Sequence, residues 1–541
     1  MVNANPSSDR PDCVQASHLT FWELDLYILG CITTLTFNFN TDKPYPLRMD
    51  TICRGILRLN SDVLLLIADH LTSKECLRLA STCKQLQAIL SDEAVRQTYI
   101  TTCERLKGFL RFILLHPCRS HCVRTLVIQD RDTHETPKVL TEVLLHTTNL
   151  SELVLSFKYE DALKNYLPLL GAINILPCLT RLQVRKFGPM ALKGFLEMRS
   201  RLRSLELFKA LPEAMDGIFP QGGALETLEK LTLRGCSTDD DDVIAGSNAV
   251  WPTVRSLQVC DTDVCLQDLV EYFPNVRKFT MRGVGFQFHP FNQTMSKSDL
   301  WPNLDHFIPY WPDLVTYGRN LIVFPVRRLT FLNTFEDICA VHDDEQFRTL
   351  LQDIQPIVLS FPAIADNPDH TTIPLRLQVP QPVWKNLRCL TVSLLESSKI
   401  DGIYSWIYGL EDSIGELSLL SFCLSIYRPY DVPLQDIQAN LDSSTPNHIP
   451  TMLYGILKHT RFIGVDFSSQ HNLRPYWWCA IQEETLFIRI PDNCNYSLTK
   501  ALHKMDGTPE GLSRVKRALP RSILDLIPQD DDGNILSCKI L

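Results

Sequence analysis

One apolar pattern recurs through the first half of the chain. An apolar residue is followed by two further residues, an apolar residue, one further residue and a third apolar residue. Seven successive copies are Val123-Leu126-Ile128, Leu150-Leu153-Leu155, Leu179-Leu182-Val184, Leu202-Leu205-Leu207, Leu228-Leu231-Leu233, Val254-Leu257-Val259 and Val276-Phe279-Met281. Their starts are separated by 27, 29, 23, 26, 26 and 22 residues. This near-constant spacing predicts one strand in each unit of a repeat array.

The stretches between these strands show helical spacing. Residues Thr136 to His146 place four apolar residues on one face of a predicted helix. A second helix is predicted to start at Asp263, a candidate cap, and to end before Pro274. Neither a strand nor a helix of this kind buries its apolar face alone, so stacked units share a core. The predicted fold class is α/β, an irregular solenoid of strand–turn–helix repeats.

The repeat pattern continues less regularly after residue 283. Further copies are Val326-Leu329-Phe331, Leu387-Leu390-Val392 and Ile414-Leu417-Leu419, with Ile354-Ile357-Leu359 as another candidate. Residues 283–325 are rich in Trp, Pro and Phe, and residues 360–386 are rich in Pro, so both are predicted to be insertions or distorted repeats. Beyond about residue 430 the pattern fades. Candidate late elements are strands at Arg461–Phe467 and Glu484–Ile490 and a capping helix near Leu512–Ile527.

A different pattern precedes the repeats, in residues 57–90. These residues predict three short helices with apolar positions at helical spacing. The apolar positions are Val63, Leu64, Ile67 and Leu71 in the first helix, Leu77, Leu79 and Ala80 in the second, and Leu86, Ile89 and Leu90 in the third. Three helices in about 40 residues form a marginal core, so we expect a partner or a neighbouring domain to stabilise them.

This segment resembles an F-box. The matching positions are Leu59, Asp62, Val63–Ile67, Leu71, Cys76–Leu79, Cys83-Lys84 and Ser91-Asp92. The segment departs from the family pattern in three places: Asn60 replaces a proline, Gln85-Leu86 lacks the frequent aromatic residue, and Arg96 replaces a tryptophan. An F-box followed by leucine-rich repeats is a known architecture, and residues 55–430 look like its fungal form.

The resemblance implies a non-catalytic substrate adaptor of a ubiquitin ligase. Its F-box would bind a Skp-family linker protein and, through it, a cullin and RING scaffold, while the repeats bind a target that the sequence does not identify. The residues implied to face the linker, or to support that face, are Leu59, Asn60, Val63, Leu64, Ile67, Leu71, Leu77 and Leu79. No cofactor is implied.

Three alternatives remain open at this point. Residues 59–90 can be an N-terminal helical cap on the solenoid. The chain can then be a leucine-rich-repeat interaction scaffold with no role in ubiquitin transfer. Residues 283–541 can also conceal an enzyme, although no convergent His, Asp, Ser or Cys motif appears there.

Charge and cysteine content narrow the choice of partners and compartment. The net charge of −9 disfavours a nucleic-acid backbone as the main partner. The 18 cysteines follow no regular framework, which favours free thiols in a reducing compartment, the cytoplasm or the nucleus. No membrane span is predicted, because Glu23 and Asp25 interrupt the apolar segment Leu19–Phe39.

Several other clusters are candidates for chemistry or recognition. Cys118, His121 and Cys122 lack a second metal-binding pair, so no metal site is expected. The acidic runs Asp239–Asp242 and Asp530–Asp532 are interpreted as solvated loops. Tyr476, Trp477 and Trp478 are interpreted either as an exposed recognition cluster or as buried residues of the last repeats.

The predicted organisation has four parts. An extension spans residues 1–54, with Met49 as an alternative translation start. The F-box-like domain spans 55–100, the solenoid 101–490, and a tail or cap 491–541.

Overall fold

The structure is a computed structural model that describes residues 61–524 with internal gaps. The longer gaps are 130–134, 158–166, 188–197, 211–223, 236–249, 288–300, 311–325, 332–350, 365–385, 396–399, 428–448, 467–475 and 481–486. The predicted N-terminal extension, Leu59, Asn60 and both acidic runs lie outside the described residues. The chain divides into two compact units, Met1–Val154 and Leu155–Leu541.

The first unit begins with a helical bundle that leads directly into strands. Its elements are α3 (Ser61–Asp69), α4 (Ser73–Ala80), α5 (Lys84–Leu90), η2 (Glu93–Val95), β1 (Gln97–Ile100), α6 (Cys103–Leu115), α7 (Pro117–Ser120), β2 (Thr125–Ile128) and α8 (Thr136–His146). Strand β3 (Glu152–Ser156) crosses the boundary to the second unit. Strands β1 and β2 are parallel. The prediction of a helix from Thr136 to His146 is confirmed.

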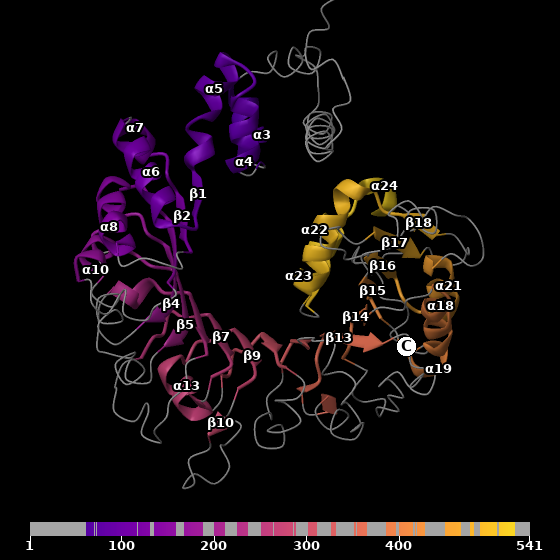
Figure 1. Ribbon diagram of the computed structural model, residues 1–541. Helices are drawn as coiled ribbons and strands as arrows, with labels where there is room; N and C mark the ends of the chain where they lie inside the picture. The colour runs from indigo at the N-terminus through magenta and orange to yellow at the C-terminus, as the bar shows by residue number, and fades with distance from the viewer. Residues whose placement is uncertain are drawn as a thin grey trace, which may run out of the picture. The chain divides into compact units, whose positions relative to one another are not determined.

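The second unit contains a long, mostly parallel sheet (Figure 1). Its strands up to the middle of the unit are β4 (Arg181–Phe187), β5 (Ser204–Ala210), β6 (Lys230–Arg234), β7 (Ser256–Cys260), β9 (Lys278–Arg282), β11 (His306–Ile308) and β12 (Arg328–Thr330). The sheet continues with β13 (Val358–Ile364), β14 (Cys389–Leu395), β15 (Ser421–Tyr427), β16 (Phe462–Asp466), β17 (Tyr476–Ala480) and β18 (Phe487–Arg489). The last two pairings, β16 with β17 and β17 with β18, are antiparallel.

Shorter elements accompany this sheet. They are α10 (Leu167–Asn174), η3 (Ala224–Thr227), β8 (Val264–Cys265), α13 (Leu266–Tyr272), β10 (Phe286–Gln287), α18 (Ile400–Gly409), α19 (Glu411–Ile414), α21 (Ile449–Ile456), α22 (Asp492–His503), α23 (Pro509–Arg517) and α24 (Arg521–Leu524). The predicted helix near Asp263 begins later, at Leu266, because Val264 and Cys265 pair with β10.

The register of the sheet aligns the apolar positions that define the repeats. Leu182, Leu205, Leu231, Leu257 and Phe279 are partners on successive strands, and all are buried. Side chains alternate between the two faces of a strand, so the intervening residues form rows on the opposite face. The strands predicted from the seven regular copies are therefore present where the sequence places them.

Two later strands have a different frame from the predicted one. In the candidate Ile354-Ile357-Leu359, Leu359 was assigned the third apolar position, but it pairs with Leu329 and so occupies the second. Ile414 ends helix α19, and the strand begins at Ser421 instead. The apolar positions in register there are Leu419, Phe422 and Leu424. Adjacent apolar residues allowed both frames in each stretch, so spacing alone selected the wrong one.

One strand lies inside the predicted insertion 283–325. Strand β11 pairs with β9 on one side and β12 on the other. Leu304 and Phe307 occupy the first two apolar positions of a repeat and are buried. Pro309 stands near the third position, which is why the pattern was not recognised.

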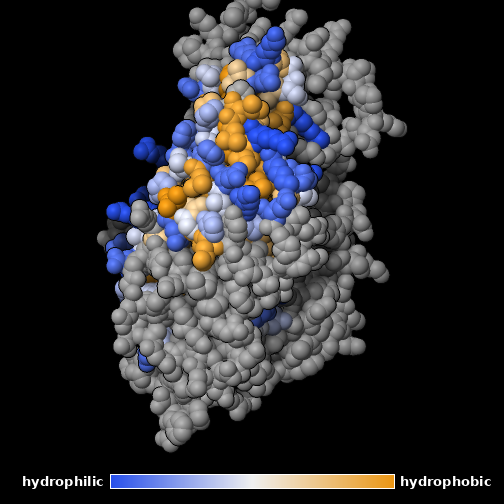
Figure 2. All heavy atoms as spheres, turned by 60° about the vertical axis from the view of Figure 1, so that its left-hand side comes forward, coloured by the Kyte–Doolittle hydropathy of each residue, from blue (hydrophilic) through white to orange (hydrophobic). Residues whose placement is uncertain are grey.

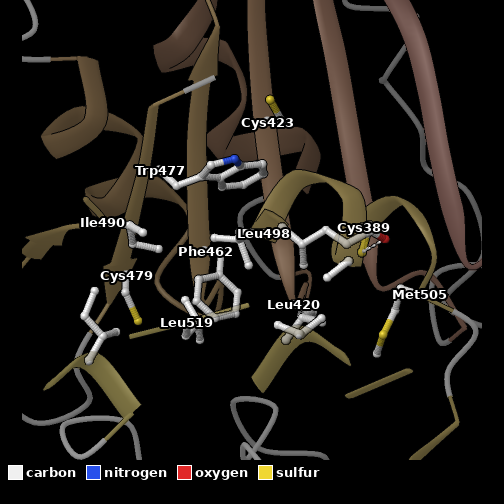
Figure 3. Close-up of a cluster of buried hydrophobic side chains, with 14 of the residues drawn as sticks. Cys389, Leu420, Cys423, Phe462, Trp477, Cys479, Ile490, Leu498, Met505 and Leu519 are labelled. Carbon is white, nitrogen blue, oxygen red and sulfur yellow. Dashed lines mark hydrogen bonds between the residues drawn. The ribbon is translucent and has the colours of Figure 1, made fainter. Parts of the chain in front are cut away.

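The C-terminal helices pack on the sheet face opposite to the repeat leucines. Leu498 and Leu502 of α22 and Val515 of α23 join Val358 and Cys389 in one buried cluster (Figure 3). The Cys389 Sγ atom lies 3.8 Å from the carbonyl oxygen of Leu502. The predicted tail helix is present as α23 and α24, separated at Leu519 and Pro520, and it lies against this face.

Candidate functional site

The bundle of α3, α4 and α5 closes around its own small core (Figure 1). The core residues come from all three helices and from η2, and the buried members are Leu64, Ala68, Cys76, Leu79, Ala80, Leu86, Leu90 and Ala94. Small side chains at Ala68, Cys76 and Ala80 allow short helices to approach closely. The core of the bundle therefore closes without every leucine of the three helices being buried in it.

Polar groups at the helix ends fix the turns of the bundle. The Leu71 amide donates to the carbonyl of Ala68 at 3.0 Å, and the Cys76 thiol lies 3.6 Å from the same oxygen. The Thr82 hydroxyl donates to the carbonyl of Leu79 at 2.7 Å. The Cys83 Sγ atom accepts from the Leu86 amide at 3.5 Å and caps α5. These bonds satisfy helix ends that would otherwise fray.

The bundle continues into the first strands of its unit without a linker. The amides of Arg124 and Thr125 both donate to the carbonyl of Arg96 at 2.9 Å. Because Arg96 directly follows η2 and precedes β1, these bonds attach the end of the bundle to β2. The three helices thus lie in one compact unit with β1 and β2.

Among the side chains of the bundle that the structure describes, two large apolar ones are exposed. Leu77, in α4, is 56% exposed, and Leu65, in α3, is 38% exposed. An exposed leucine on a closed three-helix bundle gains free energy when a second protein covers it, on the order of 1.5–3 kcal/mol if burial is complete. Within the described side chains of the bundle, these two leucines provide an apolar surface for a partner.

The structure describes six of the eight residues predicted to face the linker, and they differ in exposure. Leu64 and Leu79 lie in the bundle core, where they support a surface but do not form it. Ile67 is buried, and Leu71 packs partly buried against the core. Val63 is half-buried, and Leu77 is exposed.

Leu65 was not among the residues selected from the sequence. A signal for it exists, because residues 63–67 are five consecutive apolar residues. An α-helix has 3.6 residues per turn, so five consecutive positions cannot all face one core. At least one of them has to face outward, and the structure identifies Leu65.

Exposed apolar residues also occur on the helices that follow the bundle. Leu114 and Leu115 of α6 and Leu145 of α8 are about half exposed or more. Figure 2 shows the side of the molecule to which these helices contribute, with apolar side chains flanked by hydrophilic ones. The bundle is therefore not the sole apolar surface of the described residues. Exposed leucines of α6 and α8 offer control positions outside the bundle.

The described residues of this unit provide no evidence for a metal site or a reactive thiol. No group of three or more His, Cys, Asp or Glu residues that could hold a metal ion occurs among the described residues. Cys118 is exposed, and partial burial raises the pKa of the Cys122 thiol. No helix in the described segments has the length and apolar content needed to cross a membrane.

Trp477 and Trp478 lie in the second unit and are only 2% and 6% exposed. Of the two interpretations of this aromatic cluster, burial in the last strands therefore holds for both tryptophans. Trp477 points into the cluster covered by α22, and its Nε1 atom donates to the Thr499 hydroxyl at 2.9 Å (Figure 3).

Comparison with known families bears on the bundle alone. No curated protein matches the chain. Residues 56–97 match the family model of the F-box domain, and this range contains α3, α4, α5 and η2. F-box domains in general bind Skp-family linker proteins, and proteins that carry them are typically non-catalytic adaptor subunits. The segment that resembles an F-box in sequence is thus an F-box domain, folded as three helices with Leu77 and Leu65 exposed.

Proposed function

We propose that this protein is a substrate adaptor of a Skp–cullin–F-box ubiquitin ligase. The F-box domain docks on the Skp-family linker through the surface that contains Leu77 and Leu65. The second unit is a leucine-rich-repeat array that holds the target. The observation that carries the proposal is the F-box match on a bundle whose core is complete while two leucines remain exposed.

The adaptor acts by proximity and breaks no bond itself. When it holds a target lysine near a ubiquitin-charged enzyme, the transfer becomes effectively intramolecular. The requirement on the adaptor is therefore two surfaces, one for the linker and one for the target. We place the complex in the cytoplasm or the nucleus, where the free thiols of the described cysteines are stable.

Parallel strands in register, each one repeat apart in sequence, support the repeat-array part of the proposal. Leucine-rich repeats place their leucines on one side of the sheet and leave variable residues on the other. The rows described above have this arrangement.

The test is co-purification of the full chain with a Skp-family linker protein. Leu77→Lys is expected to weaken binding by about 10- to 100-fold, because it replaces about 1.5–3 kcal/mol of apolar burial with a charge. The matched control is Leu145→Lys, which changes a leucine of nearly equal exposure, 52%, on α8. The control is expected to bind as tightly as the unmodified chain.

Leu64→Ala separates docking from folding. It removes a core side chain and is expected to destabilise the bundle by about 2–5 kcal/mol, which thermal unfolding would register. Leu77→Lys is expected to leave the melting temperature nearly unchanged. If the linker does not bind the unmodified chain, the bundle is a helical cap and the protein a scaffold without a ubiquitin role. If the linker binds Leu77→Lys and the unmodified chain equally, the docking surface does not include Leu77.

A further inference from the structure

The sheet face opposite to the repeat leucines carries a row of basic residues. The register aligns Arg181, Ser204, Lys230, Ser256, Lys278, His306 and Arg328 across β4, β5, β6, β7, β9, β11 and β12. A permanently charged residue thus occurs on every second strand. Neighbouring strands lie about 4.8 Å apart, so successive charges are about 10 Å apart.

A second basic row lies four residues further along the same strands. It contains Arg185, Arg234 and Arg282, on β4, β6 and β9. Arg185 and Arg234 both lie over the ring of Phe208, at 5.1 and 5.9 Å from its centroid. Aromatic contacts of this kind hold a guanidinium in place without neutralising its charge.

Carboxylates pair with some of the basic residues of this face. Glu206 contacts Arg181 and Lys230 at 3.1 and 2.9 Å, and Asp305 pairs with both Arg327 and Arg328. Asp261 contacts Arg234 at 3.4 Å. In the part of the chain that the structure describes, Lys278, Arg282 and Arg185 form no ion pair with a carboxylate, and all three are exposed.

Burial and neighbouring positive charges both lower the pKa values of titratable groups in the middle of the face. The side chain of Lys278 is accessible but partly desolvated at the sheet surface, and this partial burial lowers its pKa; the charges of Arg328 and Lys230 lower it further. Burial, Arg328 and Lys278 together lower the pKa of His306 to about 3, so that its ring is neutral. A neutral His306 adds no charge, and its Nε2 atom lies 3.0 Å from the Thr330 hydroxyl.

We infer that this basic face, defined by Lys230, Lys278, Arg328, Arg185, Arg234 and Arg282, binds an acidic segment of the target protein in extended form. The identification of this ligand as part of a target protein rests on the proposed function. The binding surface itself does not depend on the F-box. The chain as a whole carries a net charge of −9, so the positive rows are a local feature. Concentrated charge of one sign steers and selects an oppositely charged partner.

The spacing of the charges indicates the form of the segment. An extended peptide in the polyproline II conformation rises about 3.1 Å per residue with three residues per turn, so every third side chain points the same way, about 9–10 Å further along. An acidic residue at every third position can therefore meet Lys230, Lys278 and Arg328 in turn. The appropriate probe is a fluorescein-labelled peptide of four Glu-Gly-Ser repeats, with a Gln-Gly-Ser peptide of equal length as its neutral counterpart.

The experiment is fluorescence anisotropy with the purified full chain. The acidic peptide is expected to bind and the neutral one not, with affinity that falls as salt rises. The double variant Lys278→Gln and Arg282→Gln is expected to bind at least tenfold more weakly. Lys138→Gln, an exposed lysine of α8 outside the face, serves as the matched control and is expected to bind as before.

Four results would overturn the inference. These are no binding of the acidic peptide, equal binding by the double variant, tighter binding of a labelled poly-dT strand than of the peptide, and peptide binding that appears only after Asp239–Asp242 and Asp530–Asp532 are changed to Asn. The last result would mean that the chain's own acidic runs occupy the face. Linker co-purification of the same double variant is expected to be unchanged, so failure here is distinguishable from failure of the adaptor function.

Discussion

Asp466, in β16, shows how burial changes the pKa of one side chain. Burial raises the pKa of its carboxyl group to about 6, and its Oδ1 atom has no hydrogen-bond partner among the described residues. In the unfolded chain the same group titrates near 4. The folded protein therefore holds the proton more tightly than the unfolded protein between these two values.

The sign of the pH dependence follows from this difference. Stability falls as the pH rises from about 4 through about 6, because the unfolded chain releases the proton first. Asp466→Asn removes the charge and is expected to raise the melting temperature at pH 7.5 by a few degrees. At pH 4, where the wild-type group is largely protonated in the folded state, the two proteins are expected to melt alike. Equal melting temperatures at both pH values would contradict this account.

At the residue scale, the sequence predicts helix faces more readily than the exposure of single side chains. Leu77 is predicted to face the linker, and its side chain is 56% exposed. Leu64 and Leu79 share the apolar spacing but lie in the core, because spacing identifies a helix face and not what covers it. Which leucines remain uncovered depends on the packing angle of three helices, which a short sequence segment does not encode visibly.

The pairing of β16 with β17 is sensitive to a single added carbon at Gly464. A Cβ atom at Gly464 would approach ring atoms of Trp477 to 2.8 Å. Gly464→Ala is therefore expected to displace the indole and to destabilise the protein by about 1–3 kcal/mol. The change should appear in thermal unfolding and in the tryptophan emission spectrum.

Gly455→Ala, in α21, is the matched control. Nothing lies within 4 Å of the Cβ atom it would add. Alanine has the higher helix propensity, by about 0.5–1 kcal/mol, so this variant is expected to be slightly more stable. Equal destabilisation by both substitutions would show that the close approach to Trp477 does not decide the effect.

Elements were predictable wherever strand and helix alternated at a regular period. Strand β17 was missed because it follows β16 in an antiparallel hairpin, and its Trp477 and Trp478 do not fit the leucine pattern. Strand β11 was missed because its third apolar position is interrupted at Pro309. In both strands the pairing partner determines the structure, and that partner lies outside the local window.

Because the chain divides into two units, we expect damage to one unit to leave the binding function of the other intact. Deletion of residues 491–541 removes α22–α24 and is expected to expose Trp477, Phe462 and Leu420. Tryptophan emission should then shift to longer wavelength, and the protein should become prone to association, because an apolar cluster of this size is exposed to water. The F-box domain lies in the other unit, so linker binding is expected to persist. Unchanged emission would mean that the C-terminal helices do not seal the cluster.

The row of paired residues that begins with Arg181 changes from polar to apolar at β13. It is polar or basic through Arg328 and continues in register as Val358 and Cys389, which α22 covers. Arg328 itself donates to the carbonyl of His503 at 2.8 Å, at the end of α22. The open stretch is thus about six strand spacings, or about 30 Å, which fits roughly nine extended residues. The C-terminal helices act as a stop, and a longer ligand has to bend away from the sheet at β12.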